Sequence, residues 1–284
     1  MAVTAGVPAS NVAALQKDAA VKGMAAVLAA AGKSNAAATG SFLTVGFAFG
    51  LGMAAAILMA GHVSGGHFSP ALTTVAVIFD KFPRMKALRY FAAQLLGGLL
   101  AALLVYGLFH QQFVAFKSSA VGNTLELQHT LIRIFCSLPD GKQGVGYMFL
   151  TEFSVCFFMG LIIMACMDTS NPYISRPVAA FSVGMAYALS IWAFGTLNIS
   201  LNTAKDFSAR IVASMVIGPG AFTYKSASWV GTLVNTPAFV AAKVFYDVIF
   251  KDSKRQVELG LAKLEEPILQ PFEYSTNTDH KDCV

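Results

Sequence analysis

Two short polar turns carry the residues best suited to chemistry, and each is followed by an apolar run about half a membrane span long. The stretch 61–79 reads GHVSGGHFSPALTTVAVIF, and the stretch 202–217 reads NTAKDFSARIVASMVI. Ser69 and Asn202 each offer a side-chain oxygen to the free N–H groups at a helix start, and Pro70 suits a first helical position because it lacks that donor. Spanning a bilayer takes roughly 20 residues. Both runs are therefore predicted to be re-entrant half-helices that start near the membrane midplane.

Backbone at that depth is tolerated only where it lines a cavity or is buried in protein. Two helix N-termini that meet there would create a positive potential, which disfavours protons and cations, while polar donors replace the hydration of a neutral solute. The turns therefore predict a pore or a binding site. An intramembrane enzyme is the weaker interpretation, because the sequence offers no convergent Ser/His/Asp set.

The composition indicates an integral membrane protein. Of the 284 residues, 56% are apolar and only 12% are charged, and the mean hydropathy is +0.61, far above that of a soluble domain. The net charge of +5 comes largely from basic residues between the apolar runs, at 81–89 and 251–255, which places these segments in the cytoplasm. No nucleic-acid partner is expected. The four cysteines lack metal-ligand spacing, so we expect neither a metal nor a cofactor.

Apolar segments long enough to span a bilayer lie at about 42–61, 88–109, 145–167, 177–197 and 228–250. A weaker sixth candidate, 12–32, is interrupted by three charged residues. Six spans place both termini in the cytoplasm and a long polar connection, 110–144, outside. The predicted organisation is a disordered segment 1–11, a membrane channel domain 12–250 and a cytoplasmic tail 251–284.

The chain also reads as two inverted halves, about 12–109 and 145–250, joined by the connection 110–144. Asp18 precedes Ser69 by 51 positions, and Glu152 precedes Asn202 by 50. Each half would then hold one carboxylate in its first span. An ionisable group at such depth is costly and marks a candidate functional site.

GHVSGGHFSPALT resembles the first signature of the aquaporin (major intrinsic protein) family, in which SGGH precedes Asn-Pro-Ala. LNTAKDFSAR resembles the second signature, Asn-Pro-Ala-Arg followed by Ser or Asp. The resemblance implies an all-α, six-span right-handed bundle whose two half-helices meet head to head, with one pore in each subunit of a homotetramer. The implied pore-motif residues are Ser69, Pro70, Ala71, Asn202, Thr203 and Ala204.

Three motif positions depart from the family pattern. Ser69 replaces an asparagine, so it keeps a capping oxygen but offers fewer donors and a shorter reach. Thr203 replaces a proline and loses its preset φ, from which we expect a slightly looser second loop. Lys205 replaces an arginine and puts a compact charge on a flexible stem, which predicts a wider or less rigid filter.

The resemblance also assigns a selectivity filter. Phe49 lies 20 positions before Ser69 and is similar to the aromatic residue of that filter. Lys205 would supply its cation. The remaining walls would come from Ser190 or Ile191, and from Ile199.

Asp206, Arg210 and the long connection 110–144 resemble the glycerol-conducting branch of the family. An Asp–Arg pair four residues apart also stabilises a helix, so part of this pattern is structural. Glu152 is interpreted as a brace that accepts loop N–H groups, in preference to a proton carrier. His67 is interpreted as part of the loop packing, in preference to a gate or a metal ligand.

The predicted function is a passive channel for small neutral solutes, most of all glycerol and water, in the plasma membrane rather than an intracellular membrane. Two alternatives stay open: a non-conducting structural membrane protein of the same fold, and a channel for other small solutes such as urea, ammonia or hydrogen peroxide. No enzymatic activity is expected.

Overall fold

The computed structural model describes residues 42–119, 125–139, 143–194, 199–251 and 260, and every regular element among them is a helix. Four of these helices are long and apolar enough to cross a bilayer. Each lies within a few residues of a predicted span, which confirms the all-α membrane architecture. The predicted span at 12–32 lies outside the described residues. The four helices are α4 (Phe42–Ser64), α6 (Arg84–Leu108), α9 (Val145–Met167) and α10 (Arg176–Phe194).

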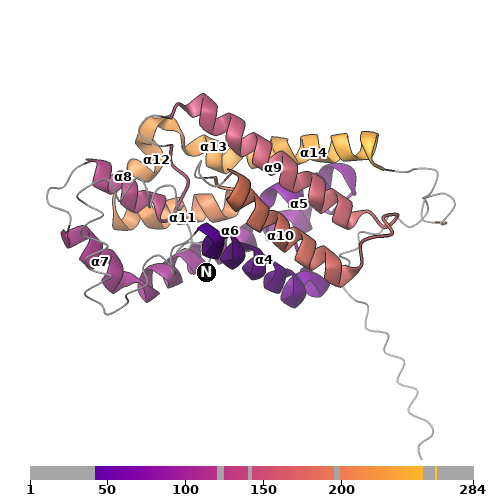
Figure 1. The fold of residues 1–284 in the computed structure, drawn as a ribbon, viewed down its shortest axis with the longest axis horizontal. Coiled ribbons are helices and arrows are strands. Elements are labelled where there is room, and N and C mark those ends of the chain that lie inside the picture. Colours follow the sequence, from indigo (N-terminus) through magenta and orange to yellow (C-terminus); the bar gives the residue numbers. More distant parts are fainter. Residues whose placement is uncertain (1–41, 120–124, 140–142, 195–198, 252–259, 261–284) are drawn as a thin grey trace, which may run out of the picture.

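The predicted span at 228–250 is divided into α13 (Ser228–Leu233) and α14 (Asn235–Ile249). Pro237 has no N–H with which to reach the carbonyl of Leu233 one turn earlier, so the helical ladder is interrupted there. Val234 keeps helical angles, with φ −67° and ψ −26°. The two helices therefore follow one another along the same side of the molecule (Figure 1).

The connection 110–144 contains helical structure, which its polar sequence did not indicate. It holds α7 (His110–Ser119) and α8 (Leu125–Arg133). Leu131 and Ile132 of α8 are each only 1% exposed, and α8 packs against the short helix α12 (Gly220–Thr223). Burial of this apolar face stabilises a helix where a loop was expected.

The two half-helices are α5 (Pro70–Phe79) and α11 (Thr203–Val216), and both begin where the sequence predicts. They lie among the long helices (Figure 1). α5 packs on α14 and α6, whereas α11 packs on α6. Each half-helix therefore contacts the last long segment of the opposite half of the chain, as an inverted repeat requires.

The long helices α4 and α10 approach each other closely at a crossing that depends on small residues. A Cβ atom added to Gly184 would lie 2.5 Å from the carbonyl oxygen of Gly50 and 2.9 Å from the Cβ of Ala54. Helices in a membrane associate through such close backbone contact, because lipid gives little hydrophobic driving force between them.

We predict that Gly184→Ala lowers the stability of the protein in detergent by about 1–3 kcal/mol, because the new methyl group would force α4 and α10 apart. Gly52→Ala is the matched control, since a Cβ there meets no described atom within 4 Å. The control should be neutral or slightly stabilising. Thermal unfolding followed by circular dichroism checks both, and equal midpoints for the two variants would contradict the prediction.

Candidate functional site

Ser69 begins α5 as its N-cap. Its Oγ accepts the backbone N–H of Ala71 at 3.2 Å, and Pro70 occupies the first helical position. The residue is only 6% exposed. Because the oxygen acts as an acceptor in this bond, the hydroxyl proton stays available to another partner.

Asn202 begins α11 in the same way and also joins the two turns. Its Oδ1 accepts the N–H groups of Ala204 at 2.9 Å and Lys205 at 3.2 Å. Its Nδ2 donates to the carbonyl oxygen of Phe68 at 2.8 Å. Phe68 directly precedes Ser69, so the starts of the two half-helices lie side by side. One N–H of the Asn202 amide remains for other partners.

The turn before Asn202 holds a strained backbone, and Glu152 fixes it. Leu201 has a φ of +62°, a left-handed conformation that a leucine rarely adopts. Glu152 of α9 is 1% exposed, and its carboxylate accepts the N–H of Ser200 at 2.7 Å and that of Leu201 at 2.8 Å. These contacts place Glu152 where a loop brace would lie.

Asn235 extends this network to the second motif, and the sequence analysis missed it. Its Nδ2 donates to Glu152 at 2.5 Å, and its Oδ1 accepts the hydroxyl of Thr203 at 3.0 Å. Thr203 thus gains a side-chain anchor in place of the rigidity of proline, a contact that the expectation of a looser loop did not include. The available signal was that Asn235 is the only carboxamide in the apolar stretch 228–250.

The first turn is held by α6. The ring of His67 packs against Phe82 and Tyr90, with centroid separations of 5.0 and 5.5 Å. Gln94 of α6 donates to the carbonyl oxygen of His67 and, at 3.0 Å, to the hydroxyl of Thr73. His67 therefore contributes packing and a backbone acceptor to the turn.

The residues assigned to the filter are brought together only in part. The Nζ of Lys205 lies 5.3 Å from the centre of the Phe49 ring, a cation–π contact. Ile191 belongs to the apolar cluster against which Phe49 and Ile199 pack. Ser190 is fully buried and donates to the carbonyl of Ala186 in its own helix at 2.7 Å. Of the two alternatives for that wall, Ser190 has its hydroxyl already engaged.

Asp206 and Arg210 form a buried ion pair, with 2.5 Å between Oδ2 and Nε. Asp206 also accepts the N–H of Ser137 at 2.8 Å and its hydroxyl at 2.9 Å, and Arg210 donates to the carbonyl of Ala221 at 2.5 Å. These bonds fasten the end of the connection 110–144 and α12 to α11. The ion pair is thus hydrogen-bonded to Ser137 of the connection and to Ala221 of α12.

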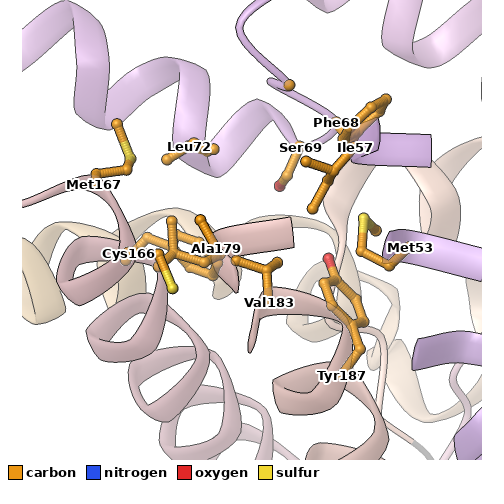
Figure 2. Close-up of a pocket in the computed structure, with 13 residues that line it drawn as sticks. Met53, Ile57, Phe68, Ser69, Leu72, Cys166, Met167, Ala179, Val183 and Tyr187 are labelled. Carbon is orange, nitrogen blue, oxygen red and sulfur yellow. The ribbon is translucent and has the colours of Figure 1, made fainter. Parts of the chain in front are cut away.

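Cavities adjoin the junction of the two half-helices. One borders Asn202 and Lys205 together with His67 and Gln94. The other is largely apolar and borders Ser69, Phe68 and a further residue, Tyr187 of α10, as Figure 2 shows. The sequence analysis did not select Tyr187. Within the described ranges, no group of three or more His, Cys, Asp or Glu side chains could hold a metal ion.

We predict that Asn235→Ala destabilises the protein by about 1–3 kcal/mol, because it removes one of the hydrogen bonds to the buried Glu152 carboxylate and the described partner of the half-buried Thr203 hydroxyl. Thr232→Val is a suitable control, since among the described residues the Thr232 hydroxyl donates to the carbonyl of Ser228 in its own helix. Thermal unfolding in detergent provides the comparison. A loss for Asn235→Ala no larger than that for Thr232→Val would refute the role given to this network.

Comparisons with known proteins agree with this geometry. A family profile described as "Major intrinsic protein" matches residues 19–245. Aquaporin-3 of Laccaria bicolor is 35% identical over 223 residues, which cover 76% of this chain and 67% of that protein. Aquaglyceroporin-2 of Rhizophagus irregularis is 33% identical over 218 residues, or 74% and 67% of the two chains.

A solved structure shares the fold. The X-ray structure of the aquaglyceroporin from Plasmodium falciparum superposes with a TM-score of 0.63 and 22% identity, over 78% of this chain and 85% of that one. The family profile itself extends over more than half of the sequence. The chain therefore belongs to the major intrinsic protein family.

Proposed function

We propose that this chain is a passive channel, and no enzyme, that conducts glycerol and water across a membrane. The observation that carries the proposal is the bond from Asn202 to the carbonyl of Phe68 at 2.8 Å, which brings the two half-helix starts together. The cavities beside this junction border Ser69 and Asn202. Relatives named as aquaporin and aquaglyceroporin support the same function.

The mechanism follows from the charge and the donors at the junction. The first turns of α5 and α11 direct their partial positive charge toward the passage, which repels protons and other cations. The Asn202 amide, the Ser69 hydroxyl and the carbonyls of the two turns replace the water that a neutral solute loses on entry. No step requires an energy source, so the flow follows the solute gradient.

The filter proposed for a small polyol combines one apolar wall with one charged donor. Phe49, Ile191 and Ile199 belong to or pack against a single apolar cluster, which suits the carbon side of glycerol. Lys205 presents an ammonium group with three donors on the ring of Phe49, which suits the hydroxyl side. The roles of Asp206 and Arg210 are to anchor α11 behind this filter.

The proposed setting is a homotetramer in the plasma membrane with cytoplasmic termini. Four basic residues lie just before α6 or in its first two turns. Such residues favour the cytoplasmic side of a membrane. The outer face of α6 carries exposed large apolar side chains, which suit contact with lipid or with neighbouring subunits. The basic residues are Lys81, Arg84, Lys86 and Arg89, and the apolar ones are Leu88, Leu96, Leu100, Leu104 and Leu108.

Transport provides the direct test. Liposomes that contain the purified full-length protein should shrink in a sucrose gradient, and reswell in a glycerol gradient, severalfold faster than empty liposomes. Stopped-flow light scattering measures both rates, and urea and hydrogen peroxide can be compared in the same vesicles. Rates equal to those of empty vesicles for water, glycerol, urea and hydrogen peroxide would leave the non-conducting structural interpretation in place.

The filter makes a second prediction. Lys205→Arg should lower the ratio of glycerol to water permeability, because the planar guanidinium is bulkier and more rigid than the ammonium group that lies over Phe49. Lys243→Arg is the matched control, since Lys243 pairs with Asp247 at 2.7 Å in α14. An unchanged solute profile in Lys205→Arg would rule out this account of the filter.

A further inference from the structure

Tyr187 brings a phenol to the junction from a helix outside the two motifs. It is 7% exposed, and its ring extends from α10 toward Ser69, with the hydroxyl at the leading end (Figure 2). It borders the same cavity as Ser69 and Phe68. A phenol thus reaches the point at which the two half-helices meet.

The hydroxyl of Tyr187 differs from those of two other tyrosines that have structural partners. Tyr90 donates to the carbonyl of Ser64 at 3.0 Å, and Tyr246 donates to Asp168 at 3.0 Å. The Tyr187 hydroxyl instead borders a cavity whose other described lining side chains are mostly apolar. A phenol both donates and accepts, so Tyr187 keeps hydrogen-bonding capacity for a group in the cavity.

Ser69 offers fewer hydrogen-bond donors and a smaller side chain than an asparagine would, and Tyr187 can supply both a donor and the missing bulk. The serine uses its oxygen to cap α5 and has a shorter reach than an amide, so the α5 side offers the passage little more than one donor. Most of the other side chains around this cavity are apolar. They include Met53, Leu72, Ile163, Val183 and Phe239.

We propose that Tyr187 and Ser69 together form a second selection point, which favours solutes that carry neighbouring hydroxyl groups. The Tyr187 hydroxyl binds one solute hydroxyl, Ser69 and Asn202 bind the next, and the apolar wall accepts the carbon side. The ring narrows the passage opposite Ser69, so that solutes pass in single file. This inference rests on the proposed channel function and adds a residue outside the two motifs and the filter.

Tyr187→Phe removes the hydroxyl and keeps the ring. We expect glycerol permeability to fall about fivefold, the rate equivalent of one hydrogen bond of about 1 kcal/mol, while water permeability changes much less. Tyr246→Phe is the matched control, because it removes another tyrosine hydroxyl that does not border this cavity. Stopped-flow rates are normalised to the amount of protein in each liposome preparation. An unchanged ratio of glycerol to water permeability in Tyr187→Phe overturns the inference.

A double-mutant cycle tests independently whether the side chains at positions 69 and 187 share one space in the passage. It also provides a test if Tyr187→Phe does not fold. Ser69→Asn should lower both permeabilities because the added amide meets the phenol, and Tyr187→Leu should restore them in the Ser69→Asn background. Additive effects of the two changes would overturn the inference. A wild-type protein that conducts neither solute refutes the channel function itself, whereas a conducting wild type with an indifferent Tyr187 refutes the second selection point alone.

Discussion

The structure depends on the burial of two helix starts in the middle of a membrane. The first N–H groups of α5 and α11 have no partners within their own helices, and lipid offers none. Ser69 and Asn202 satisfy part of this need as caps, and the amide of Asn202 then bonds to the carbonyl of Phe68 at 2.8 Å. The surrounding helices enclose this junction, since unpaired backbone at that depth would otherwise cost several kcal/mol per group.

A buried carboxylate is the second constraint. Glu152 lies inside the helix bundle, and it is tolerated there because Ser200, Leu201 and Asn235 all donate to it. The same bonds hold Leu201 in a backbone conformation that it would rarely adopt alone. These hydrogen bonds offset the cost of burying an acidic group. They also make the second turn rigid, as a solute path with fixed donors and acceptors requires.

One departure from the family motifs has a compensating contact elsewhere in this chain. Thr203 lacks the rigidity of proline, and Asn235 anchors its hydroxyl at 3.0 Å. Asp206 and Arg210, which resemble a marker of the glycerol-conducting branch, tie the connection 110–144 to α11 through Ser137. In this structure the pair therefore ties segments distant in the sequence to the second half-helix.

The sequence by itself determined the features that depend on neighbours in the chain. Span lengths, both half-helix starts and the capping roles of Ser69 and Asn202 follow from local hydropathy and hydrogen-bonding chemistry. Only the tertiary structure decided which side chains meet across the bundle. Asn235 and Glu152 are 83 positions apart, and Tyr187 and Ser69 lie on different helices around one cavity. Helix geometry fixes the general direction of a side chain, but which residues it meets depends on how segments far apart in the sequence pack, and no local pattern contains that information.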